Sequence, residues 1–372
     1  MKPIYLDHNA TTPVDPRVLE VMIPFFLEKF GNASSRSHYY GWEAEAAVDL
    51  SREKIAYLLG SRDPKNIVFT SGVTESNNLA LLGLFKGRSK SHLITQVTEH
   101  KCILEVSHFL EKEGHAVTFL PVDREGFVTP EDVARAIRPE TLVCSIMAAN
   151  NEIGTIHPLR ELISICHSKN VLFHTDAAQA LGRVDIQVER DGIDLLSFSG
   201  HKIYGPKGVG GLYVRRGILL SPLFYGGGQE RGMRSGTLNI PGIVGLARAL
   251  EIVCEEREGE NQRLRELQNF FLEQLKNSEK PFVLNGPPVS ARLPTNLNLS
   301  LLGIKAEDLI RTLPGFAFST GSACASGSTE PSYVLSSITS NKERIDSAIR
   351  LGLGRGTVRG HLEKFIQALN QL

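Results

Sequence analysis

The sequence predicts an α/β protein with a mostly parallel central sheet, helices on both faces of that sheet, and a smaller second α/β lobe. Between about residues 66 and 202, short apolar runs typical of buried strands alternate with stretches of helical spacing. Polar and glycine-rich segments follow these runs, at the strand ends where such sheets bind ligands. The chain has 372 residues, more than one hydrophobic core usually supports, which favours two lobes.

The balance of charges argues against nucleic acid or a membrane as a partner. The 41 Lys and Arg residues match the 41 Asp and Glu residues, so no overall field favours an anionic surface. The start of the chain lacks an apolar signal core, and no window is long and apolar enough to span a bilayer, so we expect a cytoplasmic protein. Five cysteines without a C-x-x-C pair argue against a disulfide framework and against an intrinsic metal site.

The N-terminal part of the chain is expected to hold one short strand and two helices. The strand is expected at residues 3–6, and the helices at residues 18–26 and 41–59, where apolar residues recur with helical spacing. Residues 7–13 form a polar turn of the kind that usually only connects elements, and residues 31–38 are expected to form a loop because they are small and polar.

A candidate phosphate site follows at residues 66–78. An apolar strand runs into a Ser/Gly/Thr turn, and a helix then continues to Leu84. The N–H groups at the start of that helix, together with the hydroxyls of Ser71 and Thr74, would bind a phosphate. Serine and threonine also cap helices routinely, so plain capping remains the alternative.

The next strand ends carry an imidazole and an amide. The strand at residues 92–95 leads to His100, and a helix is expected to begin at Cys102. His100 can stack on an aromatic ring or transfer protons near neutral pH, and it can equally cap the helix. Further strands are expected at residues 117–120 and 142–147, with a helix at 131–137. Asn151 follows the second of these strands and faces the same end of the sheet.

An aspartate and a lysine follow the last two strands of the alternating region. Asp176 follows the strand at residues 170–175, where burying a carboxylate is costly unless a cationic or protonated group such as a pyridinium nitrogen pairs with it. Lys202 follows the strand at residues 193–198, in a loop of small residues. A desolvated lysine amine has a lowered pKa and attacks carbonyls to form a Schiff base. The alternative is a solvated surface lysine on a turn.

Polar side chains thus gather at the ligand-binding edge of the expected sheet. They are Thr74, His100, Asn151, Asp176, Gln179, Ser199, His201 and Lys202. A phosphate cradle, a buried aspartate, a stacking histidine and a Schiff-base lysine are the requirements of pyridoxal 5'-phosphate, a cofactor that acts as an electron sink. The residues therefore predict this cofactor.

Beyond residue 202, the chain is expected to leave the sheet and build the second lobe. A returning strand at residues 210–214, an outward-reaching loop at 226–237 and helices at 241–276 come first. The second lobe is expected to contain strands between residues 283 and 300 and helices at 306–313 and from 342 onward. We place a large domain at residues 14–255 and a small domain at residues 1–13 and 256–372.

Cys324 differs from the other four cysteines. Those four lie within apolar helix or strand patterns, where a cysteine acts as a small hydrophobe. Cys324 lies in a Gly/Ser-rich loop, where a structural thiol gains nothing and a reactive one gains exposure and mobility. From composition alone, a reactive and a structural role are equally open.

Taken together, the motifs resemble the cysteine desulfurases of the NifS/IscS type, in the class V aminotransferase superfamily. The resemblance rests on residues 5–7 with 10–12, 69–72 with 74–77, 98–100, 150–154, 174–179, 197–208, 226–237, 321–324 and 349–350. It covers nearly the whole chain, and it implies the pyridoxal phosphate-dependent transferase fold of type I.

The resemblance implies conversion of L-cysteine to L-alanine, with the sulfur left as a persulfide on Cys324. It implies that Lys202 carries the cofactor and removes the α proton, and that Asp176 keeps the cofactor ring nitrogen protonated. His100 would stack on the ring and act as an acid or base, and Arg350 would hold the substrate carboxylate.

The resemblance also implies a homodimer with shared cofactor sites, because Thr237 would reach the phosphate of the partner subunit's cofactor. The other implied contacts are Val73 at the cofactor, Thr74, Ser199 and His201 at its phosphate, Asn151 and Gln179 at the oxygen side of its ring, and Asn151 also at the substrate. Cys324 would pass sulfur to an acceptor protein, for iron–sulfur cluster assembly or tRNA thiolation, and is a candidate transient iron–sulfur ligand.

Other functions remain to be weighed against this one. A selenocysteine lyase or another class V enzyme would keep the same cofactor residues, and Cys324 in a long loop favours sulfur transfer. A binding module on an inactive fold would lack Lys202 or Asp176, and both are present. A dehydrogenase is disfavoured because no strand is followed by G-x-G-x-x-G with a downstream acid.

The sulfur acceptor stays open at this stage. The chain stops at Leu372, soon after the helix expected around Phe365. The housekeeping enzymes of the family carry a longer C-terminal tail that docks the iron–sulfur scaffold. An iron–sulfur scaffold, a tRNA-thiolation relay and a nitrogenase-type pathway are therefore all left as alternatives.

Overall fold

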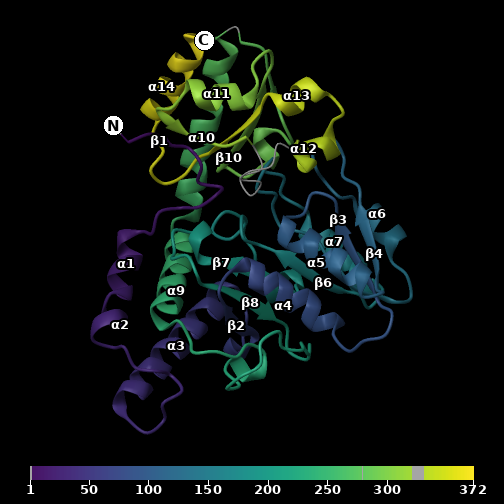
Figure 1. Ribbon diagram of the computed structural model, residues 1–372, viewed down its shortest axis with the longest axis vertical. Helices are drawn as coiled ribbons and strands as arrows, with labels where there is room; N and C mark the ends of the chain where they lie inside the picture. The colour runs from purple at the N-terminus through teal and green to yellow at the C-terminus, as the bar shows by residue number, and fades with distance from the viewer. Residues whose placement is uncertain (1, 279, 321–330) are drawn as a thin grey trace.

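The computed structural model describes residues 2–278, 280–320 and 331–372, and shows a larger lobe and a smaller lobe (Figure 1). Cys324 lies outside the described residues. The N-terminus and the C-terminus both lie at the smaller lobe. Within the described parts of the chain, no helix is long and apolar enough to cross a membrane.

The larger lobe is built on one mixed sheet. Among the described residues it has seven strands, in the order β2-β8-β7-β6-β5-β3-β4. Strands β7, β6, β5, β3 and β4 are parallel, and β8 is antiparallel to both of its neighbours. The strands are β2 (Ile67–Thr70), β3 (His92–Gln96), β4 (Ala116–Leu120), β5 (Thr141–Ser145), β6 (Leu172–Asp176), β7 (Leu195–Ser199) and β8 (Gly210–Val214). The expected fold class is confirmed.

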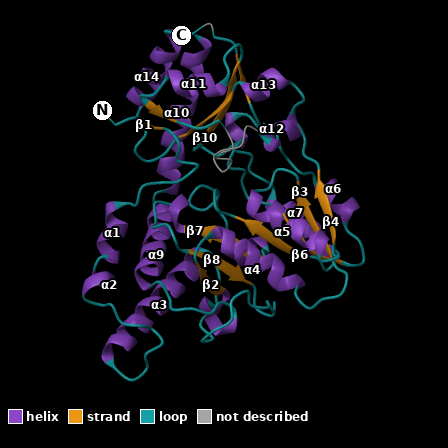
Figure 2. Cartoon of the chain, viewed as in Figure 1, coloured by secondary structure: helices purple, strands orange, loops and turns teal. Residues whose placement is uncertain are grey.

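Helices cover both faces of this sheet (Figure 2). Helices α4 (Val73–Phe85) and α5 (Lys101–Lys112) pack on one face. The other face is covered by α1 (Pro16–Met22), α3 (Tyr39–Leu58), α6 (Pro130–Ala136), α7 (Leu159–Ser168) and α9 (Ile240–Glu255). Successive strand residues point to opposite faces, so Val68 packs with α4 while Ile67 and Phe69 join the other core. Two short helices, α2 (Pro24–Leu27) and α8 (Val188–Asp191), add Phe25 and Val188 to the edge of this second core.

The smaller lobe has its own core. A three-stranded antiparallel sheet has the order β12-β10-β9, and β1 pairs in parallel with β11. The strands are β1 (Ile4–Tyr5), β9 (Phe282–Leu284), β10 (Asn296–Leu301), β11 (Phe316–Ala317) and β12 (Ala348–Gly352). The helices are α10 (Arg257–Lys276), α11 (Ala306–Thr312), α12 (Tyr333–Ile338), α13 (Lys342–Asp346) and α14 (Arg359–Asn370). Leu6, Phe271, Leu297, Leu351 and Phe365 belong to one buried cluster.

The sequence-based expectation of a helix from residue 342 onward is wrong in its middle part. Helix α13 ends at Asp346, and the chain then forms strand β12 before α14 begins. Ile349 and Leu351 are buried in the core of the smaller lobe, and Arg350 between them faces the other side. This period of two fits a strand and not a helix.

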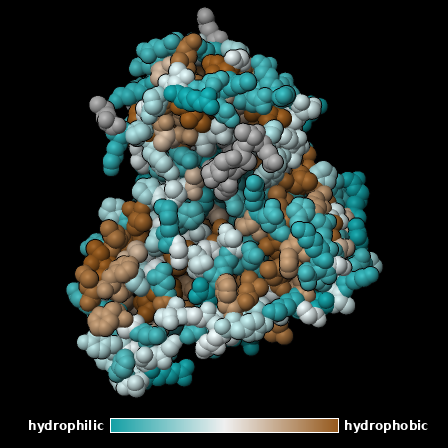
Figure 3. Space-filling view, in the orientation of Figure 1, coloured by the Kyte–Doolittle hydropathy of each residue, from teal (hydrophilic) through white to brown (hydrophobic). Residues whose placement is uncertain are grey.

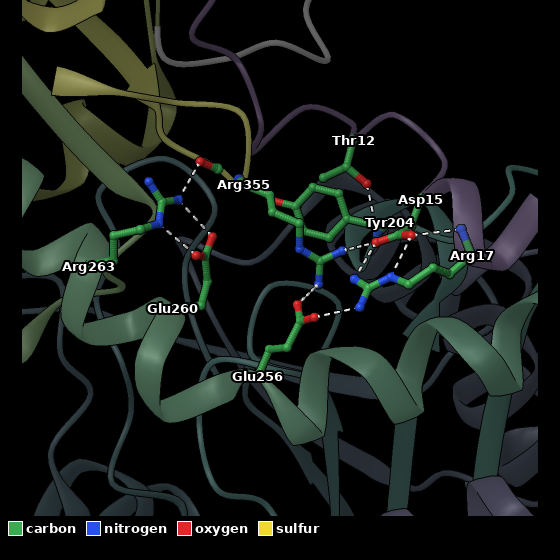
Figure 4. Close-up of polar contacts among 9 residues, drawn as sticks. Thr12, Asp15, Arg17, Tyr204, Glu256, Glu260, Arg263 and Arg355 are labelled. Carbon is green, nitrogen blue, oxygen red and sulfur yellow. Dashed lines mark hydrogen bonds and ion pairs between the residues drawn. The ribbon is translucent and has the colours of Figure 1, made fainter. Parts of the chain in front are cut away.

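A cluster of charged side chains joins the two lobes near the lysine loop (Figure 4). Arg355, which follows β12, forms ion pairs with Asp15 and with Glu256, the latter at 2.7 Å. Its guanidinium carbon lies 4.3 Å from the ring centroid of Tyr204, and its backbone N–H donates to the Tyr204 hydroxyl at 2.8 Å. Tyr204 is two residues from Lys202, so this inter-lobe cluster fixes the lysine loop against the smaller lobe.

Candidate active site

A cavity of about 280 Å³ lies at the carboxyl ends of the parallel strands. Its lining residues are Asn9, Ala10, Val73, Thr74, His100, Met147, Ala149, Asn151, Asp176, Ala178, Gln179, His201, Lys202 and Arg350. Of the predicted site residues in the described part of the chain, Ser71, Ser199 and Thr237 are the three that fall outside this lining. The other residues that sequence reasoning placed at strand ends thus lie around one cavity.

Lys202 lies at the end of a short turn that follows β7. Its Nζ donates hydrogen bonds to the carbonyl oxygens of Asn9 and Ala10, both at 2.7 Å. The turn is tight, because a Cβ added at Gly200 would lie 2.8 Å from the carbonyl oxygen of Pro206. The amine of this half-buried lysine is therefore held at the cavity.

Asn9 and Ala10 were missed by sequence reasoning, which took residues 7–13 as a simple connector. Both residues line the cavity, and Asn9 also holds Gln179 in place. The Gln179 Nε2 donates to the Asn9 carbonyl at 2.9 Å, and the Asn9 Nδ2 donates to Gln179 Oε1 at 3.2 Å. The dense run of small polar residues in this turn was the available signal.

Asp176 ends β6 with its carboxylate buried, at 5% exposure. Oδ1 accepts from the Ala178 N–H at 2.9 Å, and Oδ2 accepts from Asn77 Nδ2 at 2.7 Å. These two donors offset the cost of burying the carboxylate. Asn77 lies inside helix α4, where an asparagine carries no sequence signal of a site, so sequence reasoning missed it.

His100 is both a helix cap and a cavity residue. Its Nδ1 accepts from the Cys102 backbone N–H at 3.3 Å at the start of α5, and its ring lines the cavity. Capping and a place in the site were alternatives at the level of sequence, and the structure shows that one side chain does both.

The start of helix α4 forms the other end of the cavity. The cap position is Gly72, which has no side chain to satisfy the first N–H groups of the helix. Val73 and Thr74 line the cavity there, and a Cβ added at Gly72 would lie 3.7 Å from Ser199 Oγ. Free N–H groups at a helix N-terminus beside two hydroxyls suit a phosphate.

His201 adds a neutral imidazole to this region. Burial, followed by the charges of Lys202 and Lys207, lowers the pKa of His201 to about 4. Its Nδ1 lies 3.1 Å from Thr11 Oγ1. At neutral pH the ring is therefore uncharged and forms hydrogen bonds without adding a second cation beside Lys202.

Arg350 presents its guanidinium to the cavity from strand β12 and is 1% exposed. Nη1 donates to the Asn151 carbonyl at 3.1 Å, and Nη2 forms an ion pair with Asp7 Oδ1 at 2.9 Å. A guanidinium held in this way is suited to bind a carboxylate.

Thr237 is exposed and lies in the loop at residues 226–237. The loop is fixed to the larger lobe by buried Glu230, whose carboxylate accepts from Arg52 at 2.7 and 2.8 Å and from the Phe69 N–H at 2.7 Å. Arg234 pairs with Glu75 in the first turn of α4 at 2.7 Å. The loop is therefore firmly attached to the larger lobe, and Thr237 does not line the cavity of its own chain.

Two buried carboxyl groups, those of Glu99 and Glu152, lie next to residues that line the cavity. Burial, followed by the charge of Asp176, raises the pKa of Glu99 to about 8, and burial raises the pKa of Glu152 to about 7. Glu99 Oε1 accepts from the Met147 N–H at 2.6 Å, and Glu152 accepts from the Ser332 hydroxyl. Both groups sit next in sequence to a cavity residue, His100 or Asn151.

These side chains fit pyridoxal 5'-phosphate. A confined lysine amine, a buried carboxylate and an uncapped helix start occupy one cavity of suitable size, and each matches one part of that molecule. Fold and site together define a pyridoxal phosphate-dependent enzyme of fold type I.

Comparisons with known proteins give the same class of enzyme. A family model described as aminotransferase class-V matches residues 4–365. A cysteine desulfurase IscS of Rickettsia akari (strain Hartford) is 49% identical over 365 residues, which are 97% of this chain and 88% of that protein. A cysteine desulfurase IscS of Rickettsia bellii (strain OSU 85-389) is 48% identical over 371 residues, 99% of this chain and 90% of that protein.

Solved structures show the same relationship. A NifS-like protein superimposes with a TM-score of 0.92 at 38% identity, covering 99% of this chain and 98% of that one. The protein SspA, solved in complex with cysteine, gives a TM-score of 0.84 at 38% identity, covering 95% of this chain and 100% of that one. The chain belongs to the class V aminotransferase family, and it is a pyridoxal phosphate-dependent cysteine desulfurase.

Proposed function

We propose that this chain converts L-cysteine to L-alanine, takes up the sulfur as a persulfide on Cys324 and passes it to an acceptor protein. The observation that carries the proposal is the single cavity that holds Lys202, Asp176, His100 and Arg350. The family members at about half identity, named cysteine desulfurases, support the same reaction.

The substrate end of the cavity is assigned to Arg350 and Asn151. Arg350 binds the carboxylate of cysteine through its guanidinium, which Asp7 and the Asn151 carbonyl keep oriented. Bound pyridoxal phosphate supplies an electron sink beside the substrate α carbon. The Lys202 amine lies in the same cavity and moves the α proton.

The cofactor contacts are assigned by position along the cavity. Asp176 would keep a proton on the ring nitrogen, since its carboxylate lines the cavity and a negative charge there favours a cationic group. His100, which lines the cavity, would stack on the ring. The remaining contacts would be Val73 at the cofactor, Thr74, Ser199 and His201 at its phosphate, and Asn151 and Gln179 at the oxygen side of its ring.

The sulfur step uses Cys324. An S–S bond forms between its Sγ and the substrate sulfur, the Cβ–S bond of the substrate breaks, and the β carbon takes a proton, so that cysteine plus thiol gives alanine plus persulfide. Residues just after the Cys324 segment are held beside the cavity: the Ser332 hydroxyl donates to Glu152, and the Tyr333 hydroxyl donates to the Glu99 carbonyl at 2.7 Å. This attachment supports the assignment of Cys324.

The chain is proposed to act as a homodimer that shares its cofactor sites, with Thr237 at the phosphate of the partner subunit. Thr237 lies on an exposed loop, outside the cavity of its own chain. Large apolar side chains are also exposed on α1, α2 and the chain after them, seen as a brown area in Figure 3. They include Leu19 at 48%, Phe26 at 58%, Leu27 at 71% and Phe30 at 66% exposure.

Three finer assignments accompany the proposal. The two domains are residues 14–255 and residues 1–13 with 256–372, supported by separate hydrophobic clusters, of which the smaller contains Leu6. The compartment is the cytoplasm, supported by Cys144 and Cys166, which contact each other as free thiols. The acceptor serves iron–sulfur cluster assembly or tRNA thiolation.

The test is release of alanine and sulfide from cysteine by the purified protein with added reductant. The wild type is expected to release both in equal amounts, and Cys324→Ala to keep the visible absorption band of the cofactor while losing turnover. Cys254→Ala, on α9, is the matched control and should behave like the wild type. Sulfide release by Cys324→Ala would show that sulfur leaves by direct elimination instead. Absence of the cofactor's absorption band in the wild type would show that Lys202 does not carry the cofactor.

A further inference from the structure

A second thiol belongs to the surroundings of the active site. Cys102 lies in the first turn of α5, two residues after His100, and is 8% exposed. Its Sγ lies 2.9 Å from His100 Nδ1 and 3.1 Å from Asn77 Nδ2. Cys102 therefore contacts one residue that lines the cavity and another that holds Asp176.

The direction of each hydrogen bond follows from the chemistry of the partners. The Asp176 carboxylate only accepts, so the Asn77 side chain must point its NH₂ group toward Oδ2, which lies at 2.7 Å. The second hydrogen of the same NH₂ group then points to Cys102 Sγ. The sulfur accepts from Asn77 and has one hydrogen left to donate, and His100 Nδ1 is the acceptor within reach.

His100 Nδ1 also accepts from a second donor. The backbone N–H of Cys102 lies 3.3 Å from the same nitrogen, as a helix cap. Two donors directed at Nδ1 leave no place for a proton on that atom. In the neutral ring the proton is therefore on Nε2.

We propose that Cys102 is a positioning residue that fixes His100 in its Nε2–H form and, through Asn77, ties the ring to the carboxylate of Asp176. The inference rests on the proposed function, in which His100 and Asp176 contact the same cofactor ring. Its consequence is that neutral His100 can donate a hydrogen bond from Nε2 and cannot accept a proton there. A serine keeps both polar contacts, and an alanine keeps only the backbone donor.

A purely structural role for Cys102 makes a different prediction. The side chain also packs in the core between α4, α5 and the sheet. If packing were its whole contribution, alanine and serine would differ only in stability and would leave the state of the His100 ring unchanged. The ring state therefore separates the two roles.

The experiment compares wild type, Cys102→Ser and Cys102→Ala as full-length chains, with and without cofactor, after ¹⁵N labelling of histidine. His100→Gln assigns the His100 ring signals. Cys166→Ala removes a buried thiol from α7, on the opposite face of the sheet, and is the control. The wild type should show an unprotonated Nδ1 and a protonated Nε2, because the two ring positions have well separated nitrogen resonances.

Cys102→Ala should move the two ring signals toward each other as both tautomers become populated, and Cys102→Ser should restore the separation. In turnover of cysteine, Cys102→Ala should lower kcat about fivefold, the factor that one net hydrogen bond of ordinary strength is worth, with KM within about twofold of wild type. Cys166→Ala should match the wild type in both measurements.

A proton on Nδ1 in the wild type would overturn the proposal without any variant, as would equal behaviour of the serine and alanine variants. The ring measurement needs no turnover. If the wild type releases no alanine from cysteine, the proposed function fails while the ring signals still decide the placement of Cys102.

Discussion

At the scale of single residues, the substrate pocket depends on groups that hold the reactive ones. Arg350 is buried on a strand of the smaller lobe, and its two terminal nitrogens are oriented by Asp7 and by the Asn151 carbonyl. The guanidinium can therefore meet a carboxylate in a fixed geometry, which a lysine ammonium cannot reproduce.

We expect Arg350→Lys to raise the KM for cysteine about tenfold or more, the factor that corresponds to losing a charge-assisted hydrogen bond, with a smaller change in kcat. Steady-state alanine formation over a range of cysteine concentrations measures both constants. Arg344→Lys is the control, since Arg344 donates to Asn285 Oδ1 in the smaller lobe at 2.6 Å. An unchanged KM in Arg350→Lys would show that Arg350 does not bind the carboxylate of cysteine.

How much of the site could be predicted differs between residues. Lys202, Asp176 and His100 follow strands directly, so the strand pattern placed them at one edge of the sheet. Asn77 could not be found in this way, because it lies within a helix and its role depends on how α4 packs over β6. Cys102 was taken for a small core hydrophobe, and only the structure shows that its sulfur reaches His100.

At the scale of elements, the alternating strands and helices of the larger lobe were predictable because each carries a hydrophobic pattern long enough to recognise. The smaller lobe was predicted less well. Strand β12 has five residues between two helices, and its pattern of two buried apolar residues around Arg350 is too short to recognise without its partner β10.

The loop at residues 226–237 makes a prediction about two chains. If Thr237 acts in the partner's site, each site takes Lys202 from one chain and Thr237 from the other. In a mixed dimer of Lys202→Ala and Thr237→Val chains, one site then carries both substitutions and the other carries neither. Coexpression of the two variants, each of low activity alone, should recover about a quarter of wild-type turnover, because half of the dimers are mixed and one of their two sites is intact. Alanine formation by the purified mixture measures the recovery.

The matched control pairs Lys202→Ala with Asp176→Ala. Both residues line the cavity of their own chain. Each of the two sites in a mixed dimer therefore carries one substitution, and neither site is intact. No recovery is expected in this pair. Equal recovery, or none, in both pairs would contradict the proposed sharing of Thr237.

At the scale of the whole molecule, the site forms only when distant parts of the chain come together. The N-terminal turn supplies Asn9 and Ala10, the large sheet supplies Asp176 and Lys202, and a C-terminal strand supplies Arg350. Strand β1 pairs with β11, which brings the first residues of the chain into the C-terminal lobe. Assembly of the complete cavity is therefore coupled to the docking of the two lobes.

The buried ionisable groups also give the whole molecule a predictable dependence of stability on pH. Glu99 and Glu152 have pKa values raised to about 8 and about 7 in the folded chain, both chiefly by burial, against an ordinary value near 4.3 in the unfolded chain. Between these values the folded state binds more protons, so the free energy of unfolding falls as pH rises. Burial lowers the pKa of His8 and of His157 to about 4 and that of His174 to about 3. Their contribution to the free energy of unfolding is therefore complete well above the ordinary pKa of about 6.5 and is lost as pH falls through that value.

The two effects oppose each other up to about pH 7.5, because an unfolded histidine is still half protonated at its ordinary pKa of about 6.5; above about pH 7.5 the histidines add little to the slope. Between about pH 7.5 and 8.5 we therefore expect the free energy of unfolding, measured by urea denaturation, to fall as pH rises. Glu99→Gln and Glu152→Gln keep an acceptor oxygen but cannot ionise, so each should flatten part of this slope, with Glu99→Gln acting at the higher pH. Glu105→Gln, at an exposed position of α5, should leave the slope as it is. A slope that rises with pH in the wild type, or that survives in a Glu99→Gln, Glu152→Gln double variant, would mean that these carboxyl groups are not held as buried acids in the folded chain.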